Sequence, residues 1–70
     1  MVPANPNVVG KRMRDLRGCR TGTGVAKEIG ISYSALMKYE YGIRNPNDRT
    51  KKLIAEYYGV NPDDLFYDPE

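Results

Sequence analysis

Residues 22–41 read Gly-Thr-Gly-Val-Ala-Lys-Glu-Ile-Gly-Ile-Ser-Tyr-Ser-Ala-Leu-Met-Lys-Tyr-Glu-Tyr, and this stretch decides the fold. It contains two sets of apolar residues at helical spacing: Val25, Ala26 and Ile29, and then Leu36 and Tyr39. The first set is spaced i, i+1, i+4 and the second i, i+3, so each lines one face of a short helix. Between them, Gly30 fits the left-handed residue just past a helix end, and Ser32 is a natural N-cap. The stretch therefore predicts two short helices joined by a turn of about three or four residues.

This arrangement is that of the helix-turn-helix unit, whose second helix lies in the major groove of DNA. Thr21 is the expected N-cap of the helix before the turn, and the helix after the turn covers 33–41 and ends at Gly42. Further helices are predicted over 8–17 with Asn7 as N-cap, over 48–58 capped by Asn47 or Asp48, and in a very short segment opened by Asn61 and Pro62. The sequence contains no repeat, low-complexity segment or strand pattern. The expected fold class is all-α, a compact bundle of five helices.

The two ends of the chain are expected to lie outside this bundle. Residues 1–7 contain Pro3 and Pro6 and predict a flexible N-terminal arm, and residues 68–70 form a short C-terminal tail. The domain then covers 8–67. Its core is expected to include Thr50, Leu53 and Ile54 with Tyr57 or Tyr58, closed by Leu65 and Phe66.

Charge is distributed unevenly along the chain, although the net charge is only +2. Residues 1–52 contain all 11 Lys and Arg with four acidic residues, whereas residues 53–70 contain five acidic residues and no basic one. Such a split is typical of a chain that meets a polyanion with one face, although it also arises by chance in small proteins. We expect the acidic end to point away from DNA.

Several classes of function lack the residues that they need. The chain has no His and one Cys, which excludes His- and Cys-based metal sites, Cys-His or Ser-His catalysis and an internal disulfide. No cofactor is expected, and no group of residues indicates an enzyme. The 70 residues contain neither an apolar run of about 18 residues nor a signal-peptide pattern. We therefore expect one domain in the cytoplasm, without a membrane partner.

The order and spacing of these segments resembles the phage-repressor, or Cro/XRE-like, family of helix-turn-helix DNA-binding domains. The resemblance is carried by residues 9–17, 25–32 and 36–42, and by Arg44-Asn45-Pro46, Ile54-Ala55, Tyr58-Gly59-Val60 and Asp64-Leu65-Phe66. Together these cover most of residues 8–67. The resemblance implies a lambda-repressor-like fold, with the helix-turn-helix formed by the second and third helices. It also implies a double-stranded DNA operator as partner.

The resemblance further implies roles for individual residues. The outward positions of the helix over 33–41, where family members touch bases, are Tyr33, Ser34, Met37 and Lys38. The loop that grips the DNA backbone contains Arg44 and Asn45, and Arg12 and Glu40 match a structural ion pair between the first and third helices. The chemistry of the residues adds Thr21, Gly22 and Thr23 as candidate phosphate contacts, since bare N–H groups at a helix start approach a phosphate closely. It also adds Tyr41, which lies next to Gly42.

Some of these positions keep a structural alternative. Tyr33 can pack on the surface between the second and third helices, Tyr41 can contact the protein rather than DNA, and Gly22 and Gly24 can simply loosen a first helical turn. The family usually has Gln where this chain has Gly22, so that contact does not carry over. The family's buried Leu before the second helix is also missing. We expect Cys19 to fill its place as a small apolar residue, with a redox role as the alternative.

A single short helix reads few bases, so members of the family bind as dimers on two half-sites about 34 Å apart. The expected dimer surface is a set of aromatic residues near the C-terminus, Tyr57, Tyr58, Phe66 and Tyr67, unless these only complete the core. The expected function is that of a small stand-alone transcriptional regulator of the repressor type, acting as a homodimer. The alternative is an antitoxin-like or adaptor module that uses the same fold to hold a protein partner.

Overall fold

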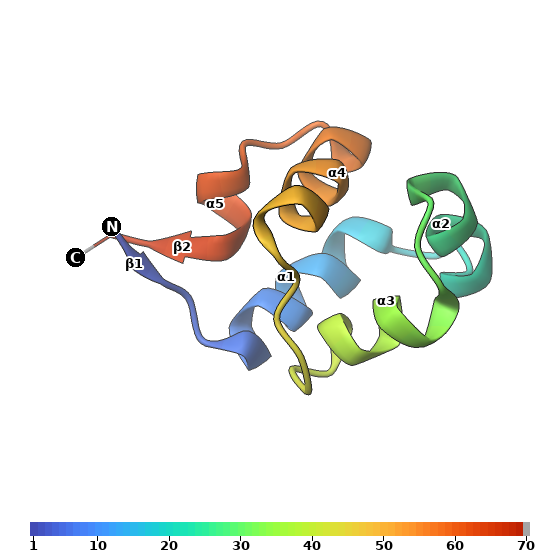
Figure 1. The fold of residues 1–70 in the computed structure, drawn as a ribbon, viewed down its shortest axis with the longest axis horizontal. Helices are drawn as coiled ribbons and strands as arrows, with labels where there is room; N and C mark the ends of the chain where they lie inside the picture. Colours follow the sequence, from blue (N-terminus) through green and yellow to red (C-terminus); the bar gives the residue numbers. More distant parts are fainter. Residues whose placement is uncertain (70) are drawn as a thin grey trace.

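The computed structural model describes residues 1–69, and within them it confirms the all-α prediction with five helices and one pair of very short strands (Figure 1). In chain order the elements are β1 (Val2–Pro3), α1 (Pro6–Arg17), α2 (Gly22–Ile29), α3 (Tyr33–Glu40), α4 (Asp48–Tyr58), α5 (Pro62–Phe66) and β2 (Tyr67–Asp68). α2 and α3 lie at one end of the molecule, and the two strands lie at the other (Figure 1). Within residues 1–69, no helix has the length and apolar character needed to cross a lipid bilayer.

Each helix begins at a residue whose side chain accepts a hydrogen bond from a backbone N–H of the first turn. At the starts of α2 to α5 these residues are Thr21, Ser32, Asn47 and Asn61. The sequence predicted three of them as caps and gave Asn47 as one of two candidates, beside Asp48. The first helix differs, because Asn5 caps it and Asn7 lies inside its first turn. Pro6 occupies the first helical position, where its fixed φ fits and its missing N–H has no partner to lose. α1 therefore begins two residues earlier than predicted.

The N-terminal segment is held against the other end of the chain. β1 and β2 form an antiparallel pair in which Val2 lies opposite Asp68 and Pro3 opposite Tyr67. The backbone N–H of Ala4 donates to the carbonyl of Phe66 at 2.9 Å, and Ala4 is buried. These contacts correct the prediction of a flexible arm over 1–7 and of a chain without strands. Two residues per strand are too few to give an alternating pattern, so only the folded positions of the two ends bring them together.

The core forms where α1 packs against α3 and α5. The largest side chains with almost no exposure are Met13, Val25, Leu36, Glu40 and Ile54, and Leu65 and Phe66 close the core as predicted. Gly10 allows the close approach of α1 and α3, since a Cβ there would lie 2.6 Å from the carbonyl carbon of Glu40. On α4, Ile54 and Ala55 face inward, whereas Leu53 is 39% exposed. The expected core position of Leu53 is wrong, because the buried side of α4 runs through Ile54 and Ala55, and Leu53 lies about 160° around the helix from Ala55.

Candidate nucleic-acid interface

α2, the turn after it and α3 have the geometry of a helix-turn-helix. Gly30 adopts a left-handed conformation, and the N–H groups of Gly30 and Ile31 both donate to the carbonyl of Ala26, at 2.9 and 3.0 Å. Ser32 Oγ then accepts a hydrogen bond from the N–H of Ala35 at 3.0 Å and starts α3. The apolar faces that the sequence predicted are buried, namely Val25, Ala26 and Ile29 on α2 and Leu36 and Tyr39 on α3.

α3 presents its other face to solvent. Tyr33 is 52% exposed, Ser34 and Lys38 are also exposed, and Met37 is partly buried against the core. These four residues are spaced i, i+1, i+4 and i+5, so they share one side of the helix. The predicted base-contacting residues are thus brought together on one accessible face, with Met37 at its inner edge.

The loop after α3 contains two of the predicted phosphate-contacting residues in exposed positions. Gly42 has a φ of 72°, and the N–H groups of Ile43 and Arg44 donate to the carbonyl of Lys38 at 2.9 and 3.3 Å. Arg44 and Asn45 follow with exposed side chains. Ile43 is 74% exposed beside them, a feature that the sequence analysis missed. The signal that could have found it is a bulky apolar residue inside an otherwise polar loop.

The start of α2 supplies the next three candidate phosphate contacts. Thr21 Oγ1 accepts from the N–H of Gly24 at 3.1 Å, which makes Thr21 the N-cap. Thr21 and Thr23 are exposed, and Gly22 between them is partly buried. A Cβ built on Gly22 would lie against side chains of α3, whereas one built on Gly24 would meet only the Thr21 hydroxyl. Gly22 therefore packs against α3, whereas Gly24 does not.

Tyr41, the last predicted phosphate contact, lies at the surface directly after α3. It is 60% exposed, and the guanidinium of Arg14 lies 5.5 Å from the centre of its ring. A cation above an aromatic face is attracted by the ring quadrupole. The contact with Arg14 fits the structural alternative for Tyr41, and the exposure of the residue leaves its phosphate contact as a proposal.

The predicted ion pair between Arg12 and Glu40 is wrong, because another arginine holds Glu40. The fully buried Glu40 carboxylate accepts hydrogen bonds from Nε and Nη2 of Arg17 at 2.9 and 3.0 Å, and its backbone carbonyl accepts one from Arg14. The hydrogen bond to Glu40 raises the pKa of the Arg17 guanidinium, although burial opposes the shift. Arg17 lies on the same side of α1 as Gly10, which packs against the Glu40 backbone, whereas Arg12 lies about 160° around the helix from Gly10 and faces α5.

Cys19 does not fill the expected core position, because its side chain is exposed. Gly18, with a φ of 59°, turns the chain after α1. Arg20 then covers the aromatic residues of α4, and its guanidinium lies 5.4 Å from the ring centre of Tyr57 and 5.5 Å from that of Tyr58. Arginine can cover this surface because its long apolar stem packs on the rings while its charged end stays in solvent.

The aromatic residues predicted as a dimer surface make contacts within the chain. The Tyr57 hydroxyl donates to the Glu28 carboxylate on α2, which raises the pKa of the Tyr57 phenol. Burial raises the pKa of the Tyr58 phenol. Phe66 is only 2% exposed and belongs to the core, which corrects its assignment to an interface. Tyr57, Tyr58 and Tyr67 are partly buried and keep some accessible surface.

A comparison with family models matches residues 11–65 to the family described as helix-turn-helix, of the Cro/C1 type. The chain belongs to this helix-turn-helix family. The match spans most of the chain and confirms the resemblance to Cro/XRE-like domains. Membership of this family supports a role in DNA-binding transcriptional regulation.

Solved structures of helix-turn-helix proteins have the same fold as this chain. The restriction-modification controller protein C.AhdI from Aeromonas hydrophila is 25% identical, with a TM-score of 0.79 over 89% of this chain and 93% of that one. The SOS-response transcriptional repressor LexA from Eubacterium rectale is 23% identical, with a TM-score of 0.83 over 100% and 78%. The DNA-binding domain of the P22 C2 repressor is 23% identical, with a TM-score of 0.77 over 89% and 84%. No curated protein sequence gives a significant match.

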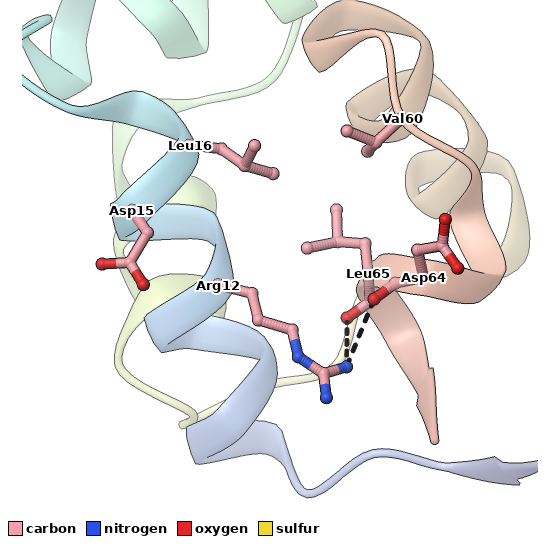
Figure 2. Close-up of a pocket in the computed structure, with 6 residues that line it drawn as sticks. All are labelled: Arg12, Asp15, Leu16, Val60, Asp64 and Leu65. Carbon is pink, nitrogen blue, oxygen red and sulfur yellow. Dashed lines mark hydrogen bonds between the residues drawn. The ribbon is translucent and has the colours of Figure 1, made fainter. Parts of the chain in front are cut away.

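In this member of the helix-turn-helix family, Arg12 lies on the side of α1 that faces α5. Its Nη1 donates to the carbonyls of Asp64 and Leu65 at 3.4 and 3.2 Å (Figure 2), and Nη2 pairs with the carboxylate of Asp68. Beside it runs a groove of about 380 Å³, in which Leu16 and Val60 approach from opposite walls (Figure 2). The residues that line the groove are Arg12, Asp15, Leu16, Val60, Asp64 and Leu65. They come from α1, from α5 and from the segment between α4 and α5, so the groove is separate from the exposed face of α3.

Proposed function

We propose that this chain binds double-stranded DNA sequence-specifically as a transcriptional regulator of the repressor type, and that it reads the major groove with α3. The observation that carries the proposal is the contrast between the two faces of α3. Its inner face is fixed to α1 by Leu36 and by the pair of Glu40 with Arg17, while Tyr33 and Lys38 stand exposed on the other side. A rigid helix with polar and aromatic side chains free on one face suits direct reading of base edges.

The exposed side chains of α3 have complementary chemistry for this task. Tyr33 offers a ring for contact with a thymine methyl and a hydroxyl for a base edge or a phosphate. Ser34 bonds to almost any base and specifies little, whereas Lys38, about one turn later, reaches guanine O6 and N7 or a phosphate. Met37 adds apolar contact at the inner edge of this face. We therefore assign base contacts to these four residues, with Tyr33 as the most discriminating.

Phosphate contacts fall to the two segments that flank this face. At the start of α2 they come from the Thr21 hydroxyl, which keeps its proton for donation, and from the backbone N–H groups of Gly22 and Thr23. After α3 they come from Arg44 and Asn45, with Tyr41 beside them. The acidic residues of α5 and β2, Asp63, Asp64 and Asp68, lie at the end of the molecule away from α2 and α3 (Figure 1). This separation keeps like charges away from the DNA backbone.

The regulator acts in the cytoplasm and as a homodimer. A dimer is needed because a single short helix reads too few bases to select one site. The partly exposed aromatic residues Tyr57, Tyr58 and Tyr67 are the proposed contact surface. Light scattering at micromolar concentration, with and without operator DNA, tests this part. A monomer under both conditions would remove the dimer and leave a single half-site as the target.

The experiment that tests the function is selection of binding sites from a pool of random duplexes at near-physiological salt, followed by sequencing. We expect enrichment of a two-fold-symmetric motif with half-sites about 10 base pairs apart. Enrichment of one unrepeated half-site would keep sequence-specific reading but not the dimer. Salt-sensitive binding to all duplexes without enrichment would refute the function and direct the search to a protein partner, the antitoxin-like or adaptor alternative.

A further inference from the structure

Gly22, at the first position of α2, lies in contact with two of the proposed base-reading side chains. A Cβ built on Gly22 would lie 2.9 Å from Cε of Met37 and 3.0 Å from Cε1 of Tyr33. Carbon atoms in contact are normally about 3.5–4.0 Å apart, so no side chain fits at this position without moving those of α3. The Tyr33 ring and the Met37 thioether are therefore packed on bare backbone.

The backbone conformation does not account for a glycine at this position. Gly22 is a helical residue, whereas the glycines with positive φ within residues 1–69 are Gly18, Gly30, Gly42 and Gly59. A glycine inside a helix is less favourable than alanine, so the first turn of α2 gains no stability from it. What distinguishes Gly22 from Gly24, two residues later, is that only Gly22 faces α3.

We propose that Gly22 is a positioning residue for base recognition: its missing side chain makes room for the Tyr33 ring across the start of α2, and this contact sets the direction in which Tyr33 points. The proposal rests on the proposed function. Tyr33 is half exposed, so the surface it packs on is what limits its rotamers. Met37 is flexible and can give way, whereas the flat Tyr33 ring must rotate about its side-chain bonds when a methyl group is placed against it.

The test compares Gly22→Ala with the matched variant Gly24→Ala, on the sequence selected by the wild-type chain and on a panel of single-base variants of it. We expect Gly22→Ala to lose about tenfold or more in preference for the selected sequence, at the base pairs where Tyr33→Ala also loses preference. Alanine keeps the backbone N–H that is proposed to contact phosphate, so affinity for random DNA should fall less than affinity for the selected sequence, and the slope of log affinity against log salt should keep its wild-type value. In Gly24→Ala the Cβ would lie 2.9 Å from the Thr21 hydroxyl and would touch neither Tyr33 nor Met37, so this variant should bind all DNA somewhat more weakly but keep the wild-type preference.

The double variant Gly22→Ala/Tyr33→Ala separates positioning from a general disturbance of the fold. If Gly22 acts through Tyr33, the double variant loses no more preference than Tyr33→Ala alone. Additive losses, or an unchanged preference of Gly22→Ala, would overturn the proposal. Equal losses on selected and random DNA would overturn it too and would assign Gly22 to phosphate binding alone.

Measurements on the free protein keep the inference separate from the function. Thermal unfolding by circular dichroism should show Gly22→Ala folded, since alanine favours helix. In the wild-type chain, nuclear Overhauser contacts should join the Gly22 Hα protons to the Tyr33 ring, and their absence would refute the packing. A wild-type chain without any sequence preference would refute the proposed function and this inference together, whereas a wild-type preference that Gly22→Ala retains would refute the inference alone.

Discussion

The carboxylate of Glu40, at the end of α3, is fully buried and lies 2.9 Å from Nε and 3.0 Å from Nη2 of Arg17, at the end of α1. Both oxygens are held by one guanidinium, which fixes the orientation of the two helices more tightly than a single contact would. Because α3 carries the proposed base-reading face, this pair sets where that face stands relative to the rest of the molecule.

Replacing Arg17 should therefore cost far more stability than replacing Arg12. Arg17→Ala leaves the Glu40 carboxylate buried without its partner, and we expect a loss of about 3 kcal/mol in the free energy of unfolding. Arg12→Ala breaks a pair with Asp68 in which the two side chains are 33% and 39% exposed, together with long hydrogen bonds to the carbonyls of Asp64 and Leu65, and should cost about 1 kcal/mol. Urea denaturation of both variants measures the difference. Equal losses, or a larger one for Arg12→Ala, would contradict the assignment of Arg17 as the partner of Glu40.

Gly10→Ala should be strongly destabilising for a steric reason. The added methyl group would overlap the Glu40 backbone, so α1 and α3 must move apart, at a cost of about 2–3 kcal/mol. Gly30→Ala is the matched control, because nothing lies within 4 Å of a Cβ there and only its φ of 94° resists the change. That variant should lose about 1 kcal/mol. A Gly10→Ala variant as stable as the wild-type chain in urea would show that the helices are not in contact at this point.

Arg44→Ala should weaken binding to all DNA sequences about equally. Arg44 stands exposed in the loop after α3, and a contact to phosphate carries no sequence information. Fluorescence anisotropy over a series of salt concentrations should show the slope of log affinity against log salt reduced by about one unit. Lys52→Ala, an exposed basic residue on α4 outside the proposed interface, controls for the loss of one positive charge. An unchanged slope for Arg44→Ala would rule out its phosphate contact.

The phenols of Tyr57 and Tyr58 should make the protein less stable in alkali. The pKa of each is raised above its usual value near 10, in Tyr57 by the hydrogen bond to Glu28 and in Tyr58 by burial. As pH rises, the unfolded chain therefore loses the two phenol protons before the folded chain does. The two phenols stabilise the fold below pH about 10, and this stabilisation is lost as pH rises through the pKa values of the folded state. Tyr58→Phe should flatten the fall in urea stability above pH about 10 while changing little at neutral pH, because the Tyr58 hydroxyl is buried without a partner within residues 1–69. A fall as steep as in the wild-type chain would assign the pH dependence to other groups.

Local signals in the sequence were sufficient to predict the helices and their order. Thr21, Ser32 and Asn61 were predicted as caps because capping acts between residues two or three apart, and the spacing of Val25, Ala26 and Ile29 predicted the buried face of α2. The family followed from the same ordered set of segments. The exposed face of α3 was likewise predictable, because residues opposite a buried stripe must face outward.

What the tertiary structure decided were the contacts between segments distant in the chain. Four arginines precede α2. Only the packing of α1 decides that Arg14 and Arg17 reach Glu40, that Arg12 reaches α5 and that Arg20 covers Tyr57. The strand pair and the contact of Gly22 with Tyr33 have the same origin. An arginine side chain has many rotamers and a glycine has no side chain. The sequence alone therefore does not show which residues will contact an arginine or a glycine in the folded chain. Those neighbours are set when the helices pack, and the sequence by itself determined only which faces would pack.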